Sequence, residues 1–235
     1  MIKNVIKMTG IKKVYHVGDE DLEVLKWVDF ELNKWEFVSI MGESGSGKST
    51  LMNIIGMLDN PTGGTYFFNG IDISQATDDE QALLRRENIG FIFQSYNLLP
   101  KTPAIKQVML PLIYQWVSAK LRKQLAIDAL IKVGLGDKIY SLPNEMSGGQ
   151  QQRVAIARAI VTDPLLILGD EPTGALDSKT GNDVMEILAQ LHKEWKTILI
   201  ITHSAEVNKY AKRHIFMKDG VISHATMKLD TSVSV

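Results

Sequence analysis

Apolar and polar positions alternate along the first forty residues, where β-branched and aromatic side chains are separated by polar turns. This alternation predicts strands over residues 6–15, 24–32 and 37–41. Three such strands joined by short connections favour a small antiparallel β layer. A glycine-rich turn follows the third strand, and apolar residues at helical spacing then predict a helix over residues 48–58.

The pattern becomes mainly helical between residues 78 and 134. The acidic residues at 78–80 are typical of a helix start, and Pro103 and Pro111 are expected to interrupt a second helical segment. We therefore expect a helical lobe inserted into the fold.

Helix and buried-strand patterns alternate in the last third of the chain. Helices are predicted over residues 150–161 and 179–193, and apolar strands over residues 165–169 and 197–202. Alternation of this kind favours a mostly parallel sheet.

Two short strands close the pattern, at residues 214–218 and 221–224. They flank the dipeptide Asp219-Gly220, which is the strongest hairpin signal in the chain. Beyond Thr226 we expect a frayed tail.

These patterns together predict a single α/β domain over residues 1–235. Its core with the β layer would cover about residues 1–93 and 160–225, and the helical lobe about residues 94–159. The tail would be residues 226–235.

The composition narrows the classes of function. Lys and Arg total 26 against 27 for Asp and Glu, so the formal charge of −1 provides no basic field and argues against nucleic-acid binding. The absence of cysteine excludes disulfides and thiolate zinc sites, and suits a reducing cytosol. The longest apolar runs are far shorter than the roughly 20 residues that cross a bilayer, and the N-terminus lacks a signal-peptide pattern, so we expect a cytoplasmic location.

Residues 42–49, Gly-Glu-Ser-Gly-Ser-Gly-Lys-Ser, fit the phosphate-loop pattern at every fixed position, between a predicted strand and a predicted helix. Glycines allow backbone N–H groups to surround phosphate oxygens at a helix N-terminus, where the helix dipole favours negative charge. Lys48 would neutralise the β- and γ-phosphates, and the Ser49 hydroxyl would bind Mg²⁺. The predicted ATP-binding residues here are Gly42, Glu43, Ser44, Gly45, Ser46, Gly47, Lys48, Ser49 and Thr50.

A second motif is an apolar strand that ends in two carboxylates, Asp170 and Glu171. Asp170 is placed to hold Mg²⁺, and Glu171 could accept a proton from the attacking water. These two motifs alone are shared by helicases, motors and kinases.

A third motif separates these classes. Residues 146–153, Met-Ser-Gly-Gly-Gln-Gln-Gln-Arg, stand shortly before the acidic strand and open a predicted helix. They resemble the signature sequence of ATP-binding-cassette (ABC) proteins. Ser147, Gly148, Gly149 and Gln150 would form a second anion site at a helix N-terminus.

The resemblance extends over nearly the whole chain and implies the ABC ATPase fold, in which a helical subdomain is inserted into a P-loop NTPase core. It also implies a head-to-tail homodimer with two ATP molecules between each phosphate loop and the partner's signature. Four further residues match family positions. Tyr15 would stack on adenine, Gln94 would touch Mg²⁺ or water, Asp177 would communicate across the dimer, and His203 would contact the γ-phosphate.

The resemblance implies an ATPase, with ATP and Mg²⁺ as cofactors and Lys48, Glu171 and His203 as catalytic residues. Within the family, the motif around Glu171 and the segment 97–100 are most similar to ATPases of macrolide or peptide exporters, of lipoprotein-release complexes and of cell-division regulators. Such a chain would drive a separate integral membrane permease from the cytoplasmic face of the cell membrane, with a periplasmic or extracellular adaptor as a further partner. The apolar segment 105–116 is a candidate docking site for the permease, with Tyr114 and Trp116 as candidate contacts, and an ordinary core helix is the alternative interpretation.

Two other functions stay open at this stage: ATP-dependent regulation of a membrane partner in cell division, and a soluble ABC ATPase of repair or translation. The chain also departs from the family pattern at three positions. Met146 stands where Leu is favoured, Ser204 stands where Asp often follows the histidine, and Trp35 stands where a turn glycine is usual. Because a non-glycine residue resists positive φ, Trp35 puts the geometry of that turn in doubt.

Overall fold

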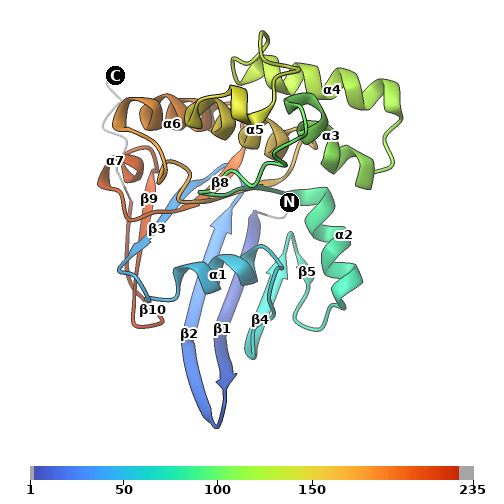
Figure 1. Ribbon diagram of the computed structural model, residues 1–235. Coiled ribbons are helices and arrows are strands. Elements are labelled where there is room, and N and C mark those ends of the chain that lie inside the picture. Colours follow the sequence, from blue (N-terminus) through green and yellow to red (C-terminus); the bar gives the residue numbers. More distant parts are fainter. Residues whose placement is uncertain (1–2, 228–235) are drawn as a thin grey trace, which may run out of the picture. The chain divides into compact units, whose positions relative to one another are not determined.

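The computed structural model describes residues 3–227 (Figure 1). The chain divides into two compact units. The first contains residues up to 74 together with those from 199 onward, and the second contains residues 75–198.

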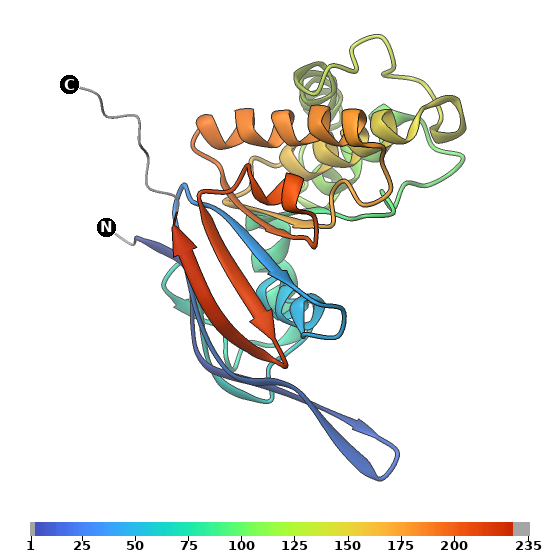
Figure 2. The ribbon, with the colours of Figure 1, turned by 90° about the vertical axis from the view of Figure 1, so that its left-hand side faces the viewer.

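The first unit contains a four-stranded antiparallel sheet with the strand order β2-β1-β4-β5. Its strands are β1 (Asn4–Val17), β2 (Glu20–Asn33), β4 (Gly63–Phe68) and β5 (Ile71–Asp72). In the register, Ile6 pairs with both Leu32 and Phe68, and these apolar side chains are fully or almost fully buried. Beyond Lys12, β1 pairs with β2 alone, and Figure 2 shows this part of the hairpin as a projecting two-stranded arm.

A second group of strands in this unit supports the phosphate loop. Strand β3 (Phe37–Gly42) pairs in parallel with β9 (Arg213–Lys218), which pairs in antiparallel fashion with β10 (Val221–Met227). Helix α1 (Lys48–Ile55) follows β3, and its buried residues Leu51, Ile54 and Ile55 recur at helical spacing. The short helix α7 (Ala205–Asn208) precedes β9.

Strand β8 (Thr197–Ile201) runs across the boundary between the two units, and all five of its residues are buried. The N–H group of Thr202, just after β8, donates to the Ile40 carbonyl of β3 at 3.1 Å.

The second unit is mainly helical, with one parallel strand pair. Strands β6 (Ile89–Ile92) and β7 (Leu166–Asp170) pair in parallel. The helices are α2 (Asp78–Asn88), α3 (Ala104–Tyr114), α4 (Ala119–Lys132), α5 (Gly148–Ile160) and α6 (Ser178–Lys193), with a 3-10 turn η1 (Pro143–Glu145) before α5. Helices α3, α4 and α5 pack on one another through fully buried apolar residues such as Val108, Leu130 and Val154.

These elements confirm the mixed α/β architecture with a parallel and an antiparallel sheet, but several local predictions were wrong. The strand predicted over residues 37–41 was expected in the antiparallel layer, whereas β3 pairs in parallel with β9. Strands β4 and β5 were not predicted, and β6 lies within the segment predicted to be mainly helical. Strands β5 and β6 have only two and four residues, too few to show a periodic pattern, and β4 begins with two glycines, which are depleted in strands. Pro111 does not interrupt a helix but lies inside α3, and Pro103 is the residue that caps its N-terminus. Pro111 is tolerated because α3 ends only three residues later.

Among residues 3–227, no helix combines the length and the apolar character needed to cross a bilayer. The predicted tail falls outside the described residues from position 228 onward.

Candidate functional site

The phosphate loop joins β3 to α1, and two of its glycines allow no side chain. A Cβ at Gly42 would lie 2.3 Å from the carbonyl oxygen of Met217 in β9, and one at Gly47 would lie 2.9 Å from a methyl group of Leu25. Gly47 also caps α1 in a left-handed conformation with φ of 95°, and Gly45 has φ of 79°. Glycine is therefore required here for two reasons. The turn needs positive φ, and the neighbouring strands lie too close for a methyl group.

Lys48 turns back over this loop. Its Nζ donates to the carbonyl oxygens of Gly42 at 2.7 Å and Glu43 at 2.6 Å, and to Ser46 Oγ at 3.3 Å. The ammonium group thus lies over the concave side of the loop, where phosphate oxygens can replace the carbonyl acceptors. Ser49 is exposed on the first turn of α1 and is available to a ligand.

Tyr15 belongs to a small polar cluster that sequence reasoning did not reveal. Its hydroxyl donates to Asp59 Oδ2 at 2.7 Å, and Lys13 Nζ lies 4.8 Å from the centre of its ring and pairs with the other Asp59 oxygen. Partial burial and the hydrogen bond to Asp59 raise the pKa of Tyr15. The hydrogen bond from its hydroxyl holds the ring in place, and the residue is half-buried.

His203 follows β8 in the first unit, and its imidazole is exposed. Its neighbours fix the backbone, because Thr202 bonds to β3 and its Oγ1 accepts from the N–H group of Ser204 at 3.0 Å. Ser204 in turn caps α7 through its hydroxyl, which accepts from Val207 N–H. Serine thus provides the helix cap at the position where the family often has Asp.

In the second unit, the two predicted carboxylates stand at the end of the buried strand β7. Asp170 is its last residue, and Glu171 follows with φ of 44°. The Glu171 carbonyl accepts from Gly174 N–H at 2.9 Å, which closes a turn directly after the strand. A glutamate in the left-handed region is strained, and strain of this kind is concentrated at functional sites.

Gln94 lies against this turn. A Cβ built on Gly174 would meet Gln94 Nε2 at 2.8 Å, so the amide packs on the backbone that follows Glu171. The segment after Gln94 is held by Arg158, whose guanidinium donates to the carbonyl oxygens of Tyr96 at 2.8 Å and Asn97 at 2.6 Å. Burial lowers the pKa of Arg158. Arg158 is a positioning residue that the sequence pattern did not single out.

The signature motif opens α5 through a reciprocal cap. Ser147 Oγ accepts from Gln150 N–H at 3.3 Å, and Gln150 Oε1 accepts from Ser147 N–H at 3.0 Å. The N–H groups of Ser147 and Gln150 are therefore both bound within the motif, and those of Gly148 and Gly149 are the ones expected to face a ligand.

Asp177 lies beside the signature. It caps α6 by accepting from Thr180 N–H at 3.0 Å and from the Thr180 hydroxyl at 2.6 Å. These hydrogen bonds from Thr180 lower the pKa of Asp177. A Cβ on Gly149 would meet the Thr180 methyl group at 2.2 Å, so the signature and the cap of α6 are in direct contact. The second unit thus brings four predicted sites together: Gln94, Glu171, the signature and Asp177.

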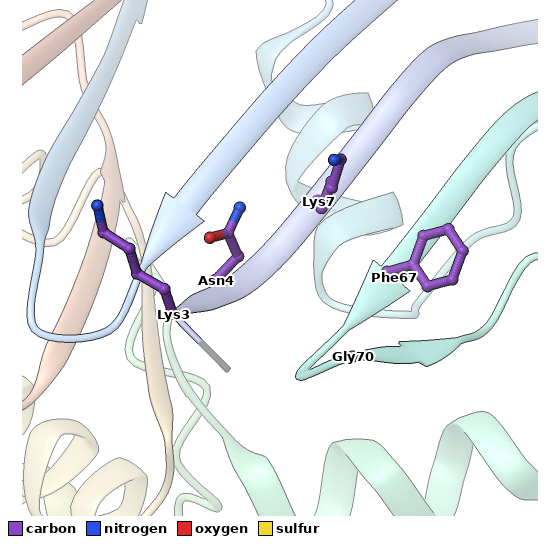
Figure 3. Close-up of a pocket in the computed structure, with 5 residues that line it drawn as sticks. All are labelled: Lys3, Asn4, Lys7, Phe67 and Gly70. Carbon is purple, nitrogen blue, oxygen red and sulfur yellow. The ribbon is translucent and has the colours of Figure 1, made fainter. Parts of the chain in front are cut away.

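Two surface pockets lie apart from the predicted residues. One of about 450 Å³, shown in Figure 3, is lined by Lys3, Asn4, Lys7, Phe67 and Gly70 on the antiparallel sheet. The other, of about 500 Å³, lies in the second unit beside α4 and α6 and is bordered by the ion pairs of Arg153 with Asp183 and Lys132 with Glu194.

Comparison with known proteins places these motifs in a wider context. The sequence profile of a family described as "ABC transporter" matches residues 25–174. The uncharacterized ABC transporter ATP-binding protein YknY of Bacillus subtilis is 50% identical over 94% of this chain and 96% of its own length. The macrolide export ATP-binding/permease protein MacB of Brucella melitensis is 49% identical over 96% of this chain, which spans only 35% of that relative.

Solved structures agree with the sequence relatives. A dimeric post-hydrolysis state of the ATP-binding cassette MJ0796, bound to ADP and phosphate, superimposes with a TM-score of 0.87 at 43% identity. That comparison covers 94% of this chain and 98% of the other.

Proposed function

The chain belongs to the ABC transporter family as an ATP-binding, ATP-hydrolysing subunit, and we propose that it powers an export permease through ATP-dependent closure of a head-to-tail homodimer. One observation carries the proposal: a single chain presents two glycine-lined helix starts, at Gly47 and at Ser147. In a two-fold dimer, each ATP would lie between the phosphate loop of one copy and the signature of the other. The dimeric cassette MJ0796 supports this arrangement.

The proposed roles follow from the local geometry. Lys48 already holds its ammonium over the loop, so binding exchanges carbonyl acceptors for phosphate oxygens. Mg²⁺ bound together with ATP would be held by oxygen donors, and the side chains that we propose for this role are Ser49 in the first unit and Asp170 and Gln94 in the second. Hydroxyl, carboxylate and amide oxygens are the donor set that Mg²⁺ prefers. Tyr15, kept in place by Asp59, would support the adenine ring.

For hydrolysis we assign Glu171 as the base that accepts a proton from the attacking water, and His203 as the group that contacts the γ-phosphate. The signature N–H groups of the partner copy would stabilise charge on the transferring phosphoryl group. Because Thr180, which is hydrogen-bonded to Asp177, contacts Gly149 of the signature, ATP bound in one site is expected to order the neighbouring helix cap.

We propose that the permease docks at the end of α3. The face formed by Ile105, Val108 and Leu112 is buried, which removes most of the predicted surface from consideration. Ile113, Tyr114 and Trp116, however, are 45%, 66% and 87% exposed, and form the part available to a partner. Loss of membrane recruitment in Tyr114→Ala, with the fold unchanged by circular dichroism, is the expected result.

Macrolides, peptides or lipoproteins are the substrate classes that we favour, since MacB is named as a macrolide export protein. An adaptor on the far side of the membrane would complete such a complex, with this chain on the cytoplasmic face. Regulation of a membrane partner without transport is the alternative. The two differ in whether ATPase activity in proteoliposomes rises when a substrate is added.

The test of the proposal is light scattering of Glu171→Gln, which should form a dimer with ATP and remain monomeric without it. Ser147→Arg in the same background is the matched control, because it fills the signature anion site and should abolish the dimer. A monomer under all conditions would refute the two-site arrangement. ATPase activity stimulated by DNA or ribosomes but not by permease-containing membranes would favour the soluble alternative instead.

A further inference from the structure

All four tryptophans of the chain have a left-handed backbone conformation. Trp27, Trp35, Trp116 and Trp195 have φ values of 61°, 64°, 59° and 66°. A non-glycine residue has positive φ in only a few per cent of cases, and a bulky one is an outlier there. The chance that four independent tryptophans all do so is on the order of 10⁻⁶.

Two of them occupy the position after a helix at which glycine is standard. After α3, Trp116 N–H donates to Ile113 O at 3.1 Å and the next N–H donates to Leu112 O at 3.2 Å. After α6, the same pair of bonds runs from Trp195 to His192 O and from residue 196 to Leu191 O. This is the Schellman motif, whose left-handed residue is usually glycine because it has no Cβ.

The chain contains the same motif in its glycine form. After α4, Gly134 has φ of 74° and donates to Ile131 O at 2.9 Å, while Leu135 donates to Leu130 O at 2.8 Å. Trp116 and Trp195 therefore stand in a backbone geometry that this protein builds with glycine elsewhere.

The other two tryptophans occupy turn and bulge positions. Trp35 is the third residue of a turn closed by Glu36 N–H donating to Asn33 O at 3.3 Å, and positive φ at that place defines the glycine position of a type II turn. Trp27 lies in β2 where the register with β1 shifts between the pairs Ile11–Val28 and Lys13–Leu25. A left-handed residue in such a bulge is again a glycine position.

Packing does not explain the choice of tryptophan. The exposed fractions of the four residues are 64%, 57%, 87% and 70% in chain order, so the indoles bury little surface to offset the strained backbone. One lies within strand β2 and three lie in the connections after β2, α3 and α6, so they are spread over the two units rather than gathered in one element as a binding surface would be.

We propose that these four positions are glycine in the protein as its own cells make it, because the codon translated here as tryptophan is decoded there as glycine. UGA is the natural candidate, since it is a stop codon in the standard code and is read as tryptophan in some variant codes. A single codon reassigned to glycine accounts for all four positions at once. It also leaves the native protein without tryptophan and gives residue 35 the turn glycine that is usual in the family.

The gene and the native protein test this directly. All four codons are expected to be TGA, and peptides of the protein isolated from its source cells should carry glycine at positions 27 and 35. These positions are convenient because each follows a lysine and so begins a tryptic peptide. Four TGG codons, or tryptophan in either peptide by mass spectrometry, would overturn the proposal.

A comparison of recombinant variants tests whether the four tryptophans strain the backbone. Replacing all four tryptophans by glycine should raise the midpoint of thermal unfolding by about 10 °C, because each left-handed non-glycine residue is strained. The matched control replaces the same four residues by alanine, which removes the indoles but keeps the Cβ, and should give little of this gain. Equal midpoints for the glycine and alanine variants would contradict the assignment of glycine positions.

Discussion

The contact between Gly149 and Thr180 allows the packing of the signature motif against α6 to be tested by mutation. Gly149 is the second residue of α5 and is buried, and a Cβ at this position would lie 2.2 Å from the Thr180 methyl group and 3.6 Å from its Cβ. Replacing a glycine by alanine inside a helix normally raises the free energy of unfolding by roughly 0.5–1 kcal/mol. At position 149 the clash of the new Cβ with the Thr180 methyl group should cost about 1–3 kcal/mol, which exceeds that gain. We therefore predict that Gly149→Ala lowers the free energy of unfolding.

A second substitution, Thr180→Ser, should remove the loss of unfolding free energy that Gly149→Ala causes. Serine keeps the hydroxyl that donates to Asp177, and removes only the methyl group that the new Cβ would strike. In this background the nearest atom is the residue 180 Cβ, at an ordinary contact distance, so Gly149→Ala should be neutral or slightly stabilising. The coupling energy between the two substitutions should be about 2 kcal/mol.

Urea denaturation of the four proteins of this cycle gives the coupling energy. Gly181→Ala is the matched control, because its Cβ would meet Thr173 Cβ at 3.4 Å without a severe clash, and a gain typical of a helical alanine is expected. If Thr180→Ser fails to rescue Gly149→Ala, then α5 and α6 are not in the contact described, and the link from the signature to Asp177 is wrong.

Three further predictions follow from the site. Gly42→Ala should abolish ATP binding in an equilibrium assay, because its Cβ would lie 2.3 Å from the Met217 carbonyl; unchanged affinity would show that the loop can shift. Arg158→Met should lose about 2–3 kcal/mol in urea denaturation with its two charged hydrogen bonds, and a loss below 1 kcal/mol would contradict that role. Burial raises the pKa of Asp59, but hydrogen bonds from Lys13, Tyr15 and the Asn60 N–H group together outweigh this effect and lower it, so the contribution of the carboxylate to stability is present above the ordinary pKa of 3.8 and lost as the pH falls through the lower folded value. The stability difference between the parent and Asp59→Asn should therefore shrink when denaturation is repeated at pH 3, and a constant difference would refute it.

The candidate site was predictable to the extent that its chemistry lies in contiguous segments. The phosphate loop, the acidic strand end and the signature each occupy a few adjacent residues with fixed glycines or carboxylates, so their chemistry can be read without coordinates. The residues that hold them are distant in sequence. Arg158 supports a turn 61 residues away at Asn97, and no local pattern marks an arginine for that task.

The sequence by itself determined the family and the order of the long helices and strands, and it predicted which residues meet the nucleotide, because hydrophobic periodicity and short motifs are local properties. Only the tertiary structure decided which glycines are indispensable and which turns are strained. The clash at Gly149, the left-handed Glu171 and the four left-handed tryptophans depend on backbone angles and on atoms brought together from remote segments. Such information arises only when the chain packs, since no linear pattern encodes the distance between two helices.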